Sequence, residues 1–128
     1  MTLRRRIAAR GGAGKFLKAL TTKQVGGSAL ERETEFYLRM HKIPHEREVE
    51  LIAGRKLRWD FAIRSKRAVI ECQGLVWDGK GAHNTPQGVM RDCEKLNLAT
   101  LAGWRCFAIT NGGGATSPAE VVRKIANL

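Results

Sequence analysis

The sequence has no apolar run near the length of a membrane span, and the arginines at its amino terminus are not followed by the apolar core of a signal peptide. It has only three cysteines, Cys72, Cys93 and Cys106, and no Cys-X-X-Cys pair. The odd count argues against a disulfide framework, and the missing pair leaves a structural zinc site without support. We therefore expect a protein of a reducing compartment, the cytoplasm, that is neither secreted nor embedded in a membrane.

Acidic residues are absent from residues 1–27, although the rest of the 128-residue chain contains twelve of them. Seven positive charges lie in this segment and account for most of the net charge of +11: Arg4, Arg5, Arg6, Arg10, Lys15, Lys18 and Lys23. We predict that residues 1–27 form a flexible basic arm that lies along DNA phosphates and strengthens binding without reading base sequence. A disordered tail that only maintains solubility is the alternative.

Residues 28–128 are enough for one domain with its own hydrophobic core. The strongly basic balance, with a pI of about 10.3, is typical of nucleic-acid binders. An anionic lipid surface or an acidic protein is the other kind of partner that such a charge would attract.

Two short apolar runs, Arg58–Ile63 and Ala68–Gly74, flank a basic turn and predict a β-hairpin. Each run contains one acid where its neighbours predict burial, Asp60 in the first and Glu71 in the second. A buried carboxylate is unfavourable unless a partner neutralises it, and two carboxylates on adjacent strands repel each other. A divalent cation that both acids share would relieve this repulsion.

Nearby arginines such as Arg55 and Arg58 are the alternative partners of these acids. The direction of the side chains bears on the choice, because successive residues of a strand point to opposite faces. Alternation places Asp60 on the face opposite Trp59 and Phe61. The same rule places Glu71 opposite Asp60 on the neighbouring strand, with Gln73 on the same face as Glu71.

The remaining patterns predict an α/β fold. Ser28 and Glu31 form a capping box at the start of a helix. The expected order is helix 28–41, strands 46–53, 57–63 and 66–73, helix 89–101, strand 104–110 and helix 118–128. Three strands followed by a helical crossover to a fourth predict a mixed central sheet flanked by helices.

The order of these blocks resembles the PD-(D/E)XK nuclease superfamily. Asp60 followed by Glu71-Cys72-Gln73 is similar to its Asp…(Asp/Glu)-X-Lys signature. Over roughly residues 28 to 110 the chain also resembles small phage- and prophage-encoded endonucleases related to the very-short-patch-repair-like and Holliday-junction-resolvase-like groups, through the blocks Arg55–Ala62, Ala68–Gly74, Gly81–His83 and Asp92–Asn97. The resemblance implies a restriction-endonuclease-like αβββαβ core, in the cytoplasm of a bacterial or phage-infected cell.

The resemblance also implies a metal site. It would hold Mg²⁺, or Mn²⁺, through Asp60, Glu71 and the main-chain carbonyl of Cys72, with Glu31 supporting the ion from a helix. The alternative for Glu31 is that it only caps its helix.

The chain departs from the family signature at Gln73, which stands in place of the lysine. An amide can position water or bind a phosphate oxygen, but it supplies no positive charge and takes no proton. Lys95, on the following helix, is expected to provide the missing charge. Its alternative role is that of an exposed lysine paired with Asp92 or contacting DNA.

Loop 74–87 has the mixed polar and aromatic content of many functional loops. We expect Lys80 to contact DNA. His83 is expected to contact a phosphate or orient a water molecule, with a solvent-exposed histidine as the alternative.

Three functions are consistent with these residues. The first is a metal-dependent DNA endonuclease that acts on branched or junction DNA, or nicks it. The second is a catalytically weak or inactive DNA-binding module on the same fold, as Gln73 would suggest. The third is a nuclease-like protein that acts through another protein. Resolving a DNA junction needs two symmetric cuts. An endonuclease that acts on junctions is therefore predicted to be a homodimer.

Overall fold

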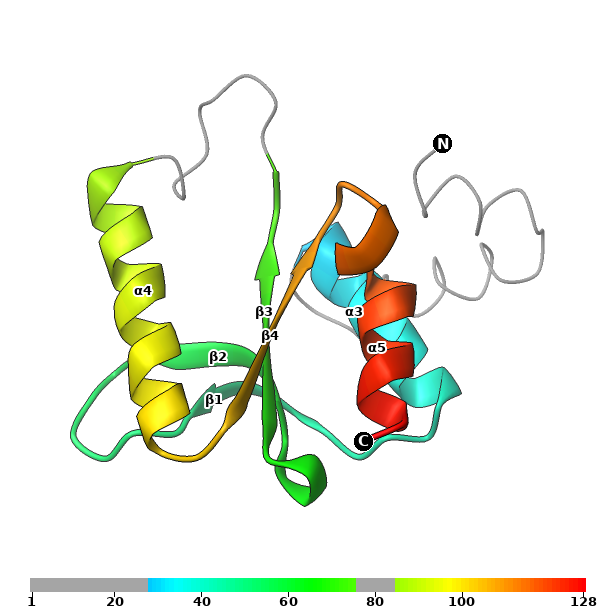
Figure 1. Ribbon diagram of the computed structural model, residues 1–128, viewed down its shortest axis with the longest axis horizontal. Helices are drawn as coiled ribbons and strands as arrows, with labels where there is room; N and C mark the ends of the chain where they lie inside the picture. Colours follow the sequence, from blue (N-terminus) through cyan, green and yellow to red (C-terminus); the bar gives the residue numbers. More distant parts are fainter. Residues whose placement is uncertain (1–27, 76–84) are drawn as a thin grey trace.

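A computed structural model describes residues 28–75 and 85–128 of the chain. The fold is α/β: a four-stranded mixed sheet stands between helix α4 on one face and helices α3 and α5 on the other (Figure 1). The described elements are α3 (Ala29–Met40), β1 (Glu46–Glu50), β2 (Arg58–Ile63), the 3-10 turn η1 (Arg64–Lys66), β3 (Ala68–Gln73), α4 (Pro86–Leu101), β4 (Arg105–Thr110), the 3-10 turn η3 (Gly114–Thr116) and α5 (Pro118–Ala126).

The strand order is β1-β2-β3-β4. β1 pairs with β2 and β2 with β3 in antiparallel fashion, whereas β3 and β4 are parallel. Parallel neighbours need a crossover connection, and α4 lies within the one that joins β3 to β4. The mixed sheet and the order of its elements confirm the predicted α/β class.

Two element boundaries differ by three residues from the sequence-based expectation, and the others differ by at most two. β1 ends at Glu50 rather than at Ala53. α4 begins at Pro86, three residues before the predicted start, because the Thr85 hydroxyl accepts from the Gly88 N–H and proline occupies the first turn. The capping box of α3 is confirmed, with Ser28 and Glu31 each accepting from the other's backbone N–H.

Each face of the sheet has its own hydrophobic core. The core toward α3 and α5 contains Phe61 and Ile70 of the sheet together with Leu38 and Val122 of the helices. The core toward α4 is smaller, with Trp59, Ala62, Val69 and Ala99 as its buried members. The two buried aromatic residues of β2 therefore belong to opposite cores.

This division shows that the predicted alternation around Asp60 is wrong, because Trp59 and Phe61 do not share a face. The backbone explains the break. Glu48 of β1, which lies between the partners of Phe61 and Trp59, has a φ of 51° that non-glycine residues rarely adopt. The regular ladder is thus distorted beside Asp60, which no hydrophobic pattern could indicate.

Candidate functional site

Three carboxylates from three elements come together where β2 and β3 separate. The paired register of these strands ends at Phe61 and Ile70, whereas β3 continues beside β4 as far as Gln73. Figure 1 shows β2 turning away from β3 in this region. Asp60 of β2, Glu71 of β3 and Glu31 in the first turn of α3 lie at this opening. Burial, and after it the Asp60 charge, raises the pKa of both glutamates.

Asp60 is anchored by the backbone of β3. The Cys72 N–H donates to the Asp60 carboxylate over 2.7 Å, which takes the place of strand pairing beyond Ile70. The Cys72 thiol faces α3, where its sulfur lies 3.6 Å from the Thr34 hydroxyl. Burial raises the pKa of this thiol well above its ordinary value, so it remains protonated at neutral pH.

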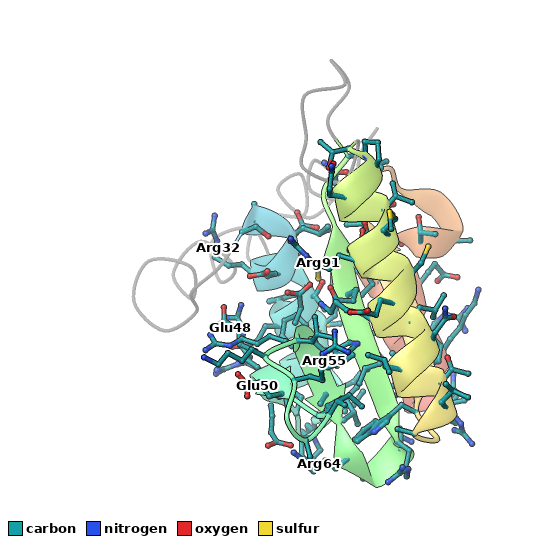
Figure 2. All side chains as sticks on the ribbon, turned by 90° about the vertical axis from the view of Figure 1, so that its left-hand side faces the viewer. Arg32, Glu48, Glu50, Arg55, Arg64 and Arg91 are labelled. Carbon is teal, nitrogen blue, oxygen red and sulfur yellow. The ribbon has the colours of Figure 1, made fainter. Side chains whose placement is uncertain are left out.

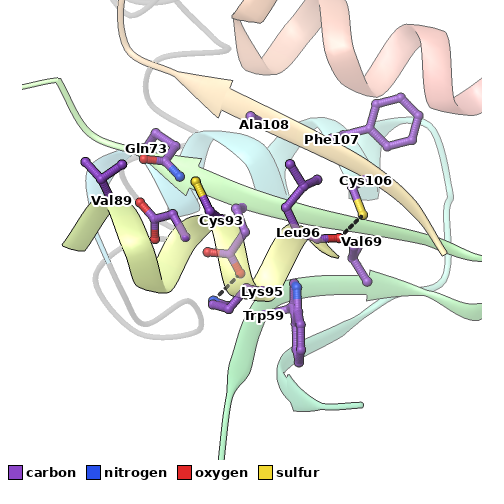
Figure 3. A pocket seen from close by; sticks show the side chains of 12 residues that line it. Trp59, Val69, Gln73, Val89, Cys93, Lys95, Leu96, Cys106, Phe107 and Ala108 are labelled. Atoms are coloured by element: carbon purple, nitrogen blue, oxygen red, sulfur yellow. Dashed lines mark hydrogen bonds and ion pairs between the residues drawn. The ribbon is translucent and has the colours of Figure 1, made fainter. Parts of the chain in front are cut away.

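Glu71 has the most altered acidity of the three carboxyl groups. Burial, followed by the negative charge of Asp60, raises its pKa from 4.5 to about 7. Lys95 of α4 acts in the opposite direction, since its Nζ lies 2.6 Å from Glu71 Oε1 (Figure 3). The ammonium group also lies 5.3 Å from the ring centre of Trp59.

This contact contradicts the view of Lys95 as an exposed helix lysine, because its side chain is only 12% exposed. The lysine reaches from α4 to the carboxylate of β3. A positive charge therefore stands beside Glu71, two residues before the position where the family signature has its lysine.

Glu31 caps its helix through Ser28 and also interacts with Asp60, so capping is not its only contact; its support of a metal ion stays a prediction. Burial and the Asp60 charge raise its pKa, whereas the Ser28 N–H and the Arg47 guanidinium lower it. Arg47 of β1 binds Glu31 at 3.1 Å and approaches Glu35 at 3.6 Å.

The arginines expected as partners of Asp60 are engaged elsewhere. Arg55 pairs with Glu94 of α4, and Arg58 lies 3.6 Å from Glu50. Figure 2 shows Glu50 and Arg55 on the side of the molecule that faces the viewer. Within residues 28–75 and 85–128, no lysine or arginine forms an ion pair with Asp60.

The structure therefore assembles Glu31, Asp60, Glu71, Cys72 and Lys95 at one place. Gln73 lies two residues beyond Glu71 and lines a groove against α4 (Figure 3). The other predicted DNA contacts lie outside the described residues: Arg4, Arg5, Arg6, Arg10, Lys15, Lys18, Lys80 and His83.

Sequence reasoning missed Arg47 and Thr34. Arg47 carried a usable signal, because it occupies the same period-two position in its strand as the apolar Val49, which predicts partial burial of a cation. Thr34 gave no comparable signal. Its hydroxyl donates to the Leu30 carbonyl within α3, as threonines commonly do, and only the tertiary structure places it against Cys72.

The donors at this opening are of the kind that hard cations prefer. They are carboxylate oxygens. Burial and then the Asp60 charge raise the pKa of Glu71, and a bound cation would relieve the repulsion between the two acids. Among the described residues, however, no three His, Cys, Asp or Glu side chains are arranged as a ready metal-binding group.

No protein-family model matches this chain, and no curated protein sequence matches it either. No helix within the described ranges is long and apolar enough to cross a membrane.

Proposed function

We propose that this protein is a Mg²⁺-dependent DNA endonuclease that hydrolyses phosphodiester bonds, acting on branched or junction DNA or as a nicking enzyme. The observation that carries the proposal is the position of Glu71, a carboxyl group with a pKa of about 7 between the Asp60 carboxylate and the Lys95 ammonium. An acid whose pKa is strongly perturbed by burial and by specific charged neighbours is a candidate for a functional site.

The second support is the resemblance to the PD-(D/E)XK nucleases. The acids that the signature contributes, Asp60 and Glu71, are close enough to interact. Its restriction-endonuclease-like core is compatible with the four-stranded mixed sheet between helices. The net charge of +11 favours DNA as the partner.

Each group at the opening has a distinct task in this proposal. When bound, Mg²⁺ or Mn²⁺ would polarise the phosphate and lower the pKa of a coordinated water. Asp60, Glu71, Glu31 and the Cys72 carbonyl would hold it. The Cys72 N–H fixes the direction of the Asp60 carboxylate before any ligand arrives.

Lys95 and Gln73 would divide the task of the signature lysine. Lys95 supplies a positive charge near the scissile phosphate, where it stabilises the charge that develops in the transition state. The Gln73 amide has both a donor and an acceptor and can orient a water molecule or bind a phosphate oxygen.

The test is cleavage of matched linear and branched DNA in Mg²⁺ by the wild type and by Asp60→Ala. We expect cleavage by the wild type, none in EDTA, and a loss of at least a hundredfold in the variant. Glu120→Ala, which removes an exposed acid of α5 paired with Arg123, is the matched control and should cut normally. Equal cleavage by the wild type and Asp60→Ala would remove the proposal.

A DNA-binding module without catalysis is the second candidate, and Gln73 is the residue that favours it. This version predicts tight, salt-sensitive DNA binding with no cutting in Mg²⁺ or Mn²⁺. Action on junctions would in addition require a homodimer, which sedimentation of the protein with and without a four-way junction would detect. In both versions we place the protein in the cytoplasm of a bacterial or phage-infected cell.

A further inference from the structure

Helix α4 is packed unusually loosely against the sheet. Of its sixteen residues only Ala99 is buried. Its apolar residues are instead largely accessible, with Val89 at 50%, Leu96 at 51% and Met90 at 71% exposure. An amphipathic helix normally buries its apolar stripe, so this face of α4 leaves a space that the side chains of residues 28–75 and 85–128 do not fill.

That space is a cavity of about 350 Å³ between α4 and the sheet, which we call the α4 groove (Figure 3). Its walls are mainly apolar and include Val89, Cys93 and Leu96 from the helix and Val69, Phe107 and Ala108 from the strands. Its polar members are Glu71, Gln73, Asp92 and Lys95. Apolar walls with a few polar groups are typical of pockets that bind a flat organic ligand.

The groove is continuous with the proposed catalytic site, because Glu71, Gln73 and Lys95 belong to both. A ligand that fills the groove while its phosphate lies beside Glu71 needs a flat, largely apolar group close to a phosphate. A nucleotide of the DNA strand meets both conditions. Its base edge would meet the Gln73 amide, which has both a donor and an acceptor, and the Asp92 carboxylate, which accepts.

We propose that the α4 groove receives one unpaired nucleobase of the bound DNA. The preferred substrate is then DNA with an unpaired nucleotide at the site of reaction, such as a branch, flap or mismatch, because a base inside continuous duplex must first be unstacked and unpaired before it can enter. This inference rests on the proposed function, whose substrate class it specifies.

A second copy of the chain is the competing occupant, since β4 is the last strand of the sheet in the described part of the chain. Two observations favour the nucleotide. The polar groups of the groove are those of the proposed catalytic site, and a net charge of +11 repels another copy but attracts a polyanion.

The experiment places 2-aminopurine at successive positions around the branch point of a DNA substrate and measures its fluorescence as protein is added in EDTA. The fluorescence of this base rises when it leaves the stack of the duplex. Two aromatic residues belong to the lining of the groove, but the Phe107 ring packs against the core toward α3 and α5, and Trp59 is only 1% exposed, so neither ring is available to stack on the base and quench it. We expect a rise of at least threefold at one position with the wild type and no rise in continuous duplex. Binding without a rise at any position would overturn the inference.

Variants that fill the groove make the test specific. Ala108→Phe places a ring in the groove from β4, and Val89→Phe does so from the accessible start of α4, so one remains informative if the other fails to fold. Both should abolish the rise and reduce the preference for branched over duplex DNA at least fivefold. Leu101→Phe, at a position of α4 that is 85% exposed and outside the groove, should behave as the wild type.

Other outcomes separate this inference from the proposed function. Asp60-dependent cleavage without a fluorescence rise would support the proposed endonuclease activity and contradict the binding of a nucleobase in the α4 groove. If the wild type shows the fluorescence rise, the two groove-filling variants lose it, and no protein cuts DNA in Mg²⁺ or Mn²⁺, the result supports nucleobase binding in the α4 groove and contradicts the endonuclease activity. A wild type that sediments as a dimer while Ala108→Phe is a monomer assigns the groove to a second copy and overturns the inference. Failure to bind any DNA overturns both.

Discussion

Lys95 Nζ and Glu71 Oε1 lie 2.6 Å apart, yet the pKa of Glu71 is raised to about 7 rather than lowered. An ammonium group at this distance favours the ionised carboxylate, so two stronger effects must oppose it. Burial is the larger, and the charge of Asp60 is the second. Glu71 therefore exchanges its proton near neutral pH, which gives it a measurable influence on stability.

The first prediction concerns the pH dependence of unfolding. Because the pKa of Glu71 rises from 4.5 to about 7 on folding, the folded state binds more protons than the unfolded state between these values. The stability from this group is thus complete below pH about 4.5 and is lost as pH rises through about 7. Its loss amounts to at most about 3 kcal/mol for a shift from 4.5 to about 7.

Urea unfolding of the wild type and Glu71→Gln from pH 4 to 9 checks this. The amide does not titrate, so the difference in free energy of unfolding between the two proteins isolates Glu71 from the other acids and histidines. Relative to the variant, the wild type should lose stability between pH about 4.5 and 7 and change little above that window. A difference that stays flat, or that increases with pH, would contradict the raised pKa.

The second prediction concerns Lys95. Lys95→Met removes the ammonium group beside Glu71 and keeps most of the apolar stem, so we expect DNA cleavage to fall by about a hundredfold, as for the loss of other charge-stabilising donors. Since Lys95 lowers the pKa of Glu71, the acidic limb of the pH–rate profile should also move to higher pH.

Lys124→Met is the matched control, because this exposed lysine of α5 lies outside the site. It should leave both the rate and the pH profile unchanged. A purely structural role for Lys95 would lower the yield of folded protein without displacing the acidic limb, and that outcome would remove its proposed part in catalysis.

Most of the fold could be predicted from the sequence because the signals were local. The capping box at Ser28 and the two apolar runs around Asp60 and Glu71 are patterns of adjacent residues, and each forms the expected element. The start of α4 was predicted three residues too late, but the sequence contains a local signal for the true start, because Thr85-Pro86 is a typical helix beginning.

The parts of the site that the sequence did not predict depend on tertiary structure. The break in alternation at Asp60 accompanies the positive φ of Glu48 on a different strand. The arginines nearest to Asp60 in the sequence pair with other acids: Arg55 pairs with Glu94 of α4, and Arg58 lies beside Glu50 of β1. The pairing of each cation with a carboxylate depends on distances in the folded structure, and the spacing of residues along the sequence does not give these distances.

The third prediction compares two arginines that share one acid. Glu35 is 3% exposed and contacts both Arg39 and Arg47. Arg47 also binds Glu31 and lies over the ring of Phe61, whereas Arg39 is 45% exposed and pairs along its own helix. Arg47→Met should therefore reduce the free energy of unfolding by about 1–3 kcal/mol, and Arg39→Met by less than about 1 kcal/mol.

Chemical denaturation of the two variants in parallel measures the difference. Arg47→Met should also weaken DNA cleavage, because Arg47 lowers the pKa of Glu31 beside Asp60. Equal destabilisation by both substitutions would show that the contacts of Arg47 with Glu31 and Phe61 add nothing beyond a surface ion pair.

The fourth prediction tests the basic arm, residues 1–27, through the salt dependence of DNA binding. Residues 28–75 and 85–128 contain fifteen Lys and Arg against eleven Asp and Glu, which leaves a charge of only +4 on the described domain and +7 on the arm. Each arginine that neutralises a phosphate contributes about 0.9 to the slope of log K against log salt concentration. Replacing Arg4, Arg5 and Arg6 by glutamine in the full chain should then reduce this slope by about 2.7.

The matched control replaces three cations of the described domain that face away from the carboxylates, Lys66, Arg105 and Lys124, and should change the slope little. Fluorescence anisotropy with duplex DNA between 50 and 300 mM salt, about a sixfold range, measures both slopes. If the arm variant keeps the wild-type slope, the arm does not lie along phosphates and its charge serves solubility instead. If the control variant loses as much slope as the arm variant, DNA binding is spread over the surface rather than concentrated in the arm.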